Sequence, residues 1–339
     1  MNKKKVVINI GMVAIFAAIT FLIPYIIYLD GTYPNGSDTF AHLYKGQMLY
    51  QALKEGNLYP MYDPYWYNGV QMLRYWAPLP VYFLAACDFL CSGNIYQGYL
   101  IFVGVVFFGG AISWLYIGNK RNHIVLGGFL GILWFFMPNN IYALVEEGNL
   151  PRALSMIVLP LLIYSIYEFL FESRYELVKW IIIEFLFMAM CHSGYAGMVA
   201  LSVLIFLLLY RIRGGSRKRS LLVMASIGLG YGLMGIWLYP SLKGGITSTD
   251  STETMKIFFQ NLTTSLNPLE RLDGVQEYFY IGLAAFIIAI FGMMAATQKS
   301  RIGFWTAFLI FICTTSTMYQ VLVLLPGSQY LWMLRFISI

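Results

Sequence analysis

The chain has 339 residues, of which 59% are hydrophobic and only 11% are charged. Soluble domains carry about 25% charged residues, so the composition excludes an ordinary soluble enzyme and predicts a membrane protein. The net charge of +6 does not indicate nucleic-acid binding, because Lys and Arg gather between apolar runs as membrane topology requires. We therefore expect a lipid bilayer, and no nucleic acid, as a partner.

Mostly apolar stretches recur along the whole chain. They cover residues 6–28, 95–117, 124–145, 150–171, 180–191, 195–210, 221–239, 280–296 and 304–317. Runs of this kind can cross a hydrocarbon core of ~30 Å as helices, where an unclosed sheet cannot satisfy its backbone. We predict an all-α, polytopic transmembrane helical bundle that forms a single membrane domain over residues 1–339.

The basic residues predict the orientation of the bundle. Residues 3–5 are all Lys, and the apolar run after them is too long for a signal peptide and has no small-x-small cleavage site, so we expect an uncleaved first span. The positive-inside rule then puts the N-terminus in the cytoplasm of a multi-pass cell-membrane protein. This topology requires Pro78–Leu90 to be a re-entrant or interfacial helix; a full crossing there is the alternative.

Two long loops are expected on the outer side, over residues 30–77 and 243–277, whereas the inner loops are short. Irregular backbone on one side predicts that the chemistry takes place there. Within the spans, Gly127-x-x-x-Gly131 and Gly228-x-x-x-Gly232 predict close packing of helices.

The first outer loop begins with a predicted helix. Ser37 or Asp38 can cap a helix that runs to about Lys54 and ends at Gly56. Asp38 and His42 are four residues apart and so share one face, although they also suit a plain N-cap acid and an interfacial residue. Four apolar residues predict a surface that lies on the membrane: Phe40, Leu43, Leu49 and Leu53.

Aromatic residues interleave with Pro, Gly, Asn and Arg over residues 59–80. Trp66, Tyr67, Asn68 and Arg74 suit a cleft in which rings stack on a sugar and Arg pairs with a lipid phosphate. The same composition equally suits an aromatic belt at the membrane interface.

Short motifs follow in a characteristic order: Gly36-Ser37-Asp38-x-x-x-His42, Tyr67-Asn68-Gly69, Glu147-Gly148-Asn149-Leu150-Pro151-Arg152, His192-Ser193-Gly194-Tyr195 and Trp237-Leu238-Tyr239-Pro240. The chain thereby resembles the GT-C superfamily of glycosyltransferases, and most closely bacterial membrane proteins named as related to pyruvoyl-tetrahydropterin synthase. The resemblance implies a GT-C-like bundle whose long first extracytoplasmic loop carries interfacial helices. It further implies transfer of a sugar from a polyprenyl-phosphate-linked donor to a glycan, lipid or protein acceptor at the outer face of the cytoplasmic membrane.

The resemblance also assigns roles to residues. Asp38 matches the catalytic acid that follows the first span, and Glu147 or Glu146 matches a second acid in a later loop. Substrate-binding roles then fall to His42, Trp66, Tyr67, Asn68, Arg74, Glu146, Asn149, Arg152 and His192. A divalent metal (Mg²⁺ or Mn²⁺) held by Asp38 and Glu147 is a further expectation, although the chain has no Asp-x-Asp motif. The pattern breaks off at Ile339, which predicts further spans beyond it.

Sugar transfer needs a base for the incoming hydroxyl and stabilisation of the departing phosphate. A carboxylate at Asp38 suits the first task, and Arg74 and Arg152 suit the second. Two plainer interpretations stay open: Glu146 and Glu147 can form a local ion pair with Arg152 at a helix start, and His192 can be a hydrogen-bonded structural residue.

A lipid-linked glycan transporter or flippase, and a non-catalytic scaffold of cell-envelope glycan assembly, are the alternative functions. A transporter should carry paired ionisable residues at mid-membrane. Glu184 is the clearest acid within a span, and most polar candidates lie in the outer loops. This distribution favours the enzyme.

Overall fold

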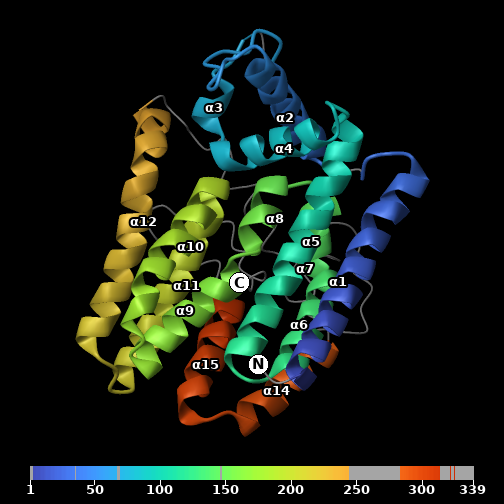
Figure 1. The fold of residues 1–339 in the computed structure, drawn as a ribbon. Helices are drawn as coiled ribbons and strands as arrows, with labels where there is room; N and C mark the ends of the chain where they lie inside the picture. The colour runs from blue at the N-terminus through green and yellow to red at the C-terminus, as the bar shows by residue number, and fades with distance from the viewer. Residues whose placement is uncertain are drawn as a thin grey trace. The chain divides into compact units, whose positions relative to one another are not determined.

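The computed structural model describes residues 3–34, 36–66, 69–145, 147–243 and 283–313, together with residues 321 and 324. In these ranges every regular element is helical, which confirms the all-α prediction (Figure 1). The elements are α1 Lys3–Asp30, α2 Thr39–Lys54, α3 Met72–Tyr75, α4 Pro78–Leu90, α5 Ile95–Lys120, α6 Ile124–Phe136, α7 Pro138–Val145, α8 Leu150–Met156, α9 Leu159–Glu172, a 3-10 turn at Tyr175–Leu177, α10 Val178–Cys191, α11 Ser193–Ile212, α12 Arg217–Lys243, α14 Leu283–Ala295 and α15 Gln298–Cys313.

Within the described part of the chain, five segments are long and apolar enough to cross a membrane: Lys3–Asp30, Ile95–Lys120, Leu150–Glu172, Ser193–Ile212 and Arg217–Ser241. The protein is thus a polytopic helical membrane protein. The predicted span 124–145 is broken, because Met137 is extended ahead of Pro138 and α6 ends at Phe136. A helix of 13 residues measures only about 20 Å, which is shorter than the hydrocarbon core.

The chain divides into two compact units. The first contains Met1–Tyr164, Ile183–Ser193 and Tyr231–Ile246, and it holds all the described candidate site residues. The second contains Ser165–Ile182, Gly194–Gly230 and Thr247–Ile339. In the second unit Tyr210 donates a hydrogen bond to the carbonyl oxygen of Leu170, which ties α11 to α9.

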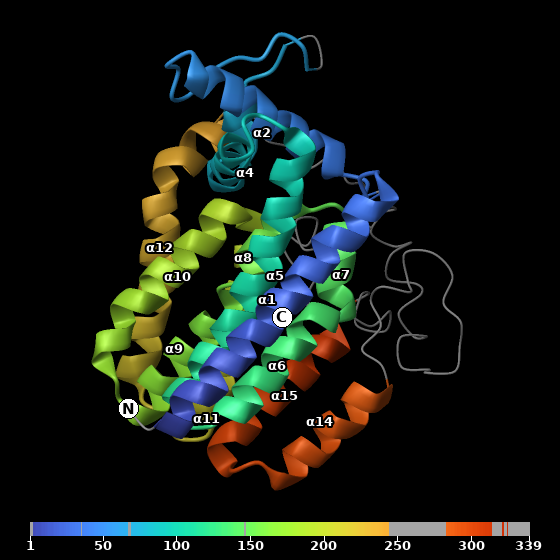
Figure 2. The ribbon, with the colours of Figure 1, turned by 45° about the vertical axis from the view of Figure 1, so that its right-hand side comes forward.

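In the first unit, α1, α5 and α6 lie side by side (Figures 1 and 2). A Cβ added at Gly127 would meet the Cα of Gly118 at 2.7 Å, so these glycines let α6 approach α5 closely. Asn9 and Asn119 exchange hydrogen bonds of 2.8 and 2.6 Å between α1 and α5. The packing prediction for Gly127 is therefore confirmed.

The other predicted glycine pair behaves differently. A Cβ at Gly228 or Gly232 would meet nothing within 4 Å, so neither glycine of α12 lies in a close contact. The prediction of helix packing at this pair is wrong for the structure described, because the α12 surface at these positions is open.

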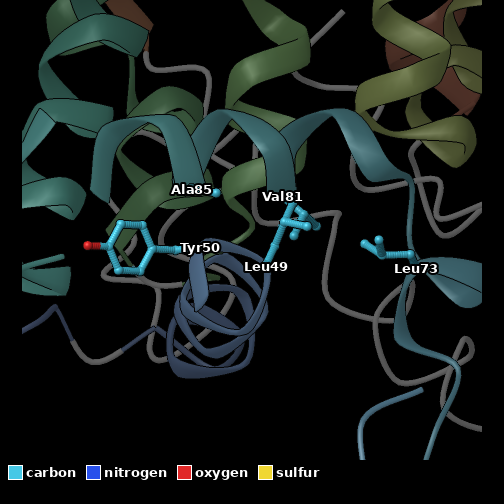
Figure 3. Packing of buried hydrophobic residues seen from close by; sticks show 5 residues of the cluster. All are labelled: Leu49, Tyr50, Leu73, Val81 and Ala85. Carbon is cyan, nitrogen blue, oxygen red and sulfur yellow. The ribbon is translucent and has the colours of Figure 1, made fainter. Parts of the chain in front are cut away.

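The long segment between α1 and α4 folds onto α4 rather than presenting a continuous apolar surface. Leu49 and Tyr50 of α2 pack with Leu73, Val81 and Ala85 in one buried cluster (Figure 3). Burying a Leu side chain contributes about 1.5–3 kcal/mol. The expectation that Leu43 and Leu49 lie on the membrane is therefore wrong, since both side chains are buried, while Phe40 stays 60% exposed.

The predicted boundaries of these two helices are confirmed. The α2 helix ends at Lys54, and Gly56 follows with a φ of 82°, which suits glycine after a helix end. The α4 helix covers Pro78–Leu90, with prolines in its first turn, and is 13 residues long. In both views α2 and α4 lie together near one end of α1 (Figures 1 and 2).

Candidate functional site

Two turns far apart in the sequence interlock at the start of α2. The backbone N–H of Asp38 donates a hydrogen bond of 3.0 Å to the carbonyl oxygen of Glu147, and the Ser37 hydroxyl donates to the same oxygen at 3.0 Å. A Cβ at Gly36 would meet the backbone of Gly148 at 2.7 Å. The glycines of the two motifs are thus needed for this close backbone approach.

Asp38 occupies the N-cap position of α2, as predicted, but its side chain does not cap the helix. No hydrogen bond joins its carboxylate to the first N–H groups of α2, and its own backbone is near the α-helical region. The carboxylate is therefore not committed to helix capping. It instead stabilises the charged form of Lys45, two turns further along α2.

Lys45 and His42 form the buried face of α2 next to Asp38. Lys45 is 1% exposed, and its ammonium lies 3.4 Å from Nδ1 of His42 and 4.1 Å from the ring centroid of Trp76. Burial lowers the pKa of Lys45 to about 7, against the opposing effect of Asp38. Burial, then Lys45 and then His192, lower the pKa of His42 well below its ordinary value, so His42 is neutral near pH 7.

The second part of the cluster comes from the segment before and within α8. An ion pair of 2.8 Å joins Glu147 to Arg152, whose side chain is fully buried. The Asn149 amide donates to Oε1 of Glu147 at 3.1 Å, while its oxygen caps α8 by accepting from the Arg152 N–H at 3.1 Å. The local ion-pair interpretation of Glu147 and Arg152 is therefore the one that the structure shows.

His192 links the two parts. The Asn149 amide nitrogen lies 3.5 Å from Nε2 of His192, and the charge of His192 acts on His42. His192 is the residue that separates α10, which ends at Cys191, from α11, which begins at Ser193. The cluster thus contains Asp38, His42, Lys45, Trp76, Glu147, Asn149, Arg152 and His192, which come from three distant stretches of the chain.

Arg74 has a structural environment of its own. Its guanidinium donates to the carbonyl oxygen of Pro240 at 3.3 and 3.2 Å and to the side-chain oxygen of Gln71 at 2.6 Å. Trp237 donates to the carbonyl oxygen of Leu73 at 2.6 Å. The Trp237-Leu238-Tyr239-Pro240 motif therefore holds α3 in place.

One aromatic residue of the first loop, Trp66, packs on α2. The Trp66 ring packs on the ring of Tyr44 with a centroid distance of 4.9 Å. Tyr44 directly precedes Lys45 in the sequence. Asp63 and Val70 form an isolated antiparallel bridge that closes this turn. The predicted site residues Tyr67, Asn68 and Glu146, and most of the loop 243–277, lie outside the described residues.

Lys45 and Trp76 are the members of the cluster that the sequence interpretation missed. A signal for Lys45 was present, because positions 38, 42 and 45 follow the helical spacing that places side chains on one face. For Trp76 no local signal exists, since its contact with Lys45 depends on the path of the chain between α3 and α4.

The described residues do not provide a suitable metal site. No group of three or more His, Cys, Asp or Glu side chains that could hold a metal ion occurs in the ranges that the structure describes. The Glu147 carboxylate is already bound by Arg152 and Asn149. The divalent metal stays a prediction, and we assign no chemical step to it.

Fold and site together define a polytopic helical membrane protein with a buried polar cluster at the start of its first loop. A family model, described as a 6-pyruvoyl-tetrahydropterin synthase related domain and membrane protein, matches residues 73–339. The chain belongs to this family of membrane proteins. No curated protein and no solved structure matches the chain.

Proposed function

We propose that this protein is a membrane glycosyltransferase that transfers a sugar from a polyprenyl-phosphate-linked donor to an acceptor hydroxyl. The observation that supports the proposal most is the position of Asp38. Its carboxylate stands at the start of α2 without capping it, beside a neutral His42 and a buried Lys45. A carboxylate held by a rigid frame in a mostly dehydrated cluster suits a general base.

The proposed reaction uses this carboxylate directly. The acceptor oxygen attacks the anomeric carbon of the donor sugar and forms the new glycosidic bond. The bond from that carbon to the phosphate oxygen breaks, and the polyprenyl phosphate leaves with the electron pair. Asp38 takes the proton of the acceptor hydroxyl. Atoms and charge then balance, because the phosphodiester monoanion becomes a phosphate monoester dianion as the Asp38 carboxylate becomes neutral, and no further reactant is needed.

Glu147 receives a supporting role in this proposal. Its backbone carbonyl holds Asp38 in place, while its side chain neutralises Arg152 and orients Asn149. Asn149 and His192 lie 3.5 Å apart next to this pair, and their polar groups suit hydrogen bonds to sugar hydroxyls.

The proposed orientation follows from the basic residues at the N-terminal end of α1 and after α5, at Lys120 and Arg121. With the N-terminus in the cytoplasm, α1 brings Asp38 to the outer side of the membrane. There the donor presents its sugar to the periplasmic or extracellular medium.

The experiment is a transfer assay on purified full-length protein in lipid nanodiscs with a panel of polyprenyl-phosphate sugars. We expect release of polyprenyl phosphate, and Asp38→Asn should slow it by about 10²-fold or more. Asp30→Asn is the matched control, because Asp30 is an exposed acid at the end of α1. Donor binding without turnover across the panel would contradict the enzyme and favour the lipid-linked glycan transporter or the scaffold.

A further inference from the structure

Three cationic side chains lie in or beside the cluster, and two of them are already bound within the protein. Arg152 is ion-paired with Glu147 at 2.8 Å. Arg74 donates to Pro240 and Gln71. An anionic ligand that bound either guanidinium would have to displace these partners.

The third cation is Lys45, whose surroundings are different. Its ammonium has three donors, whereas its described contacts are the His42 ring nitrogen at 3.4 Å and the Trp76 face at 4.1 Å. Neither contact is with a carboxylate at ion-pair distance. At 1% exposure the side chain also receives little hydration, and such a buried charge is costly unless it is compensated.

We propose that Lys45 is the residue of this site that binds the phosphate of a phosphate ester, an assignment that rests on the proposed glycosyltransferase function. The ester phosphate supplies a negative charge beside the buried ammonium, whose described contacts include no carboxylate. Trp76 holds the ammonium from its other side through a cation–π contact, and such contacts reach about 2 kcal/mol when they are desolvated. Lys45, rather than Arg74 or Arg152, then stabilises the departing polyprenyl phosphate.

The neighbouring groups are consistent with an anion at this position. His42 is neutral near pH 7, so it can donate one ring N–H without adding charge, and the Asn149 amide and His192 lie beyond it. Among the described residues, Asp38 is the acid whose charge acts on Lys45. Lys45 therefore stands between the proposed base and the leaving group, where it separates two negative charges.

A binding measurement without turnover tests this proposal. Purified protein in nanodiscs of neutral lipid is titrated with farnesyl methyl phosphate, a phosphodiester with one fixed charge, and with farnesyl methyl ether, its uncharged counterpart. We expect the wild type to prefer the phosphodiester by about tenfold or more, as a charge-assisted contact provides. Lys45→Met keeps the apolar stem and should abolish this preference.

Lys54→Met is the matched control, because Lys54 is an exposed lysine at the end of the same helix. It should retain the full preference. Competition by inorganic phosphate would show that the phosphate alone is recognised, whereas binding that persists in its presence would show that the lipid chain contributes. An unchanged preference in folded Lys45→Met would overturn the proposal.

Proton uptake gives a second measurement that does not depend on a variant. Burial lowers the pKa of Lys45 to about 7, and a bound anion must raise it again. Titrations near pH 7.5 in buffers with different ionisation enthalpies should thus show uptake of a fraction of a proton with the phosphodiester. Absence of uptake would contradict the proposal even if Lys45→Met fails to fold.

The binding measurements and the transfer assay can fail independently of each other. Phosphodiester binding through Lys45 with no sugar transfer would sustain the phosphate site and refute the transferase. Sugar transfer with an unchanged binding preference in Lys45→Met would sustain the transferase and refute the assignment of Lys45.

Discussion

The backbone N–H of Asp38 and the carbonyl oxygen of Glu147 are joined by a hydrogen bond of 3.0 Å. The two acids that the sequence marks as candidates, more than one hundred positions apart, are thereby parts of one frame. Their side chains serve different purposes, because Glu147 is paired with Arg152 and Asp38 acts on Lys45.

Gly148 should be essential for the frame. Its φ is +63°, and a Cβ there would meet the backbone nitrogen of Thr39 at 2.6 Å. Gly148→Ala is therefore expected to destabilise the protein by about 1–3 kcal/mol, seen as a lower melting temperature in detergent. Gly228→Ala is the control, since a Cβ at Gly228 meets nothing within 4 Å, and it should be neutral or slightly stabilising. Equal melting temperatures for the two variants would contradict the interlocked turns.

Removing the charge of Glu147 should be costly for stability. Glu147→Gln leaves the fully buried Arg152 without its ion-pair partner, which destabilises by about 3–5 kcal/mol in comparable cases. Adding Arg152→Met should recover most of this loss, because no uncompensated charge is then left.

The control for this prediction is Glu176→Gln. Its partner Arg174 is 38% exposed and Glu176 is 58% exposed, so solvent screens the pair and the loss of stability should be much smaller. The comparison is made by thermal melting of the purified proteins. A similar small loss at Glu147 would show that its ion pair is not important for folding.

The stability contributed by Lys45 should depend on pH. Because burial lowers its pKa to about 7, the folded protein loses this proton at lower pH than the unfolded chain does. Above about pH 7, up to the unfolded pKa near 10, the unfolded chain binds more protons, so stability rises with pH. The free energy of unfolding of the wild type, relative to that of Lys45→Met, should thus increase by up to about 1.4 kcal/mol per pH unit. Melting curves between about pH 6.5 and 9 check this, and a constant difference would contradict the buried ammonium.

Trp237 should control the order of the first loop. Its indole N–H donates to the Leu73 carbonyl at 2.6 Å, so Trp237→Phe removes one anchor of α3. Losing such a bond costs about 0.5–1.5 kcal/mol, and hydrogen exchange over residues 57–77 should become faster. Trp180→Phe is the control, because Trp180 is 47% exposed in α10. Identical exchange in both variants would argue against this anchor.

The orientation of the chain can be tested with introduced cysteines. Ser37→Cys should react with an impermeant thiol reagent from outside intact cells, and Ser216→Cys only after permeabilisation. Labelling of Lys120→Cys from outside would instead make α4 a full crossing. Outside labelling at position 216 would reverse the proposed topology.

The sequence by itself determined the helical membrane class and the ends of individual helices, because both depend on local patterns of residues. Long apolar runs predicted a helical membrane protein, because each run must satisfy its own backbone in lipid. The same local rules located the ends of α2 and α4 and placed Asp38 and His42 on one face. They failed at the span 124–145, where Pro138 divides one apolar run into two short helices. They also failed on α2, where Leu43 and Leu49 are buried, and at Gly228 and Gly232, which have no close neighbour.

Only the tertiary structure decided which side chains meet. Helical periodicity carries no information on the partners of a residue more than one hundred positions away, so the interlocking of Asp38 with Glu147 was not predictable. The same holds for Trp76 over Lys45 and for the binding of Arg74 to Pro240. These contacts arise from packing of the whole unit, and they determine which cation remains available to a ligand.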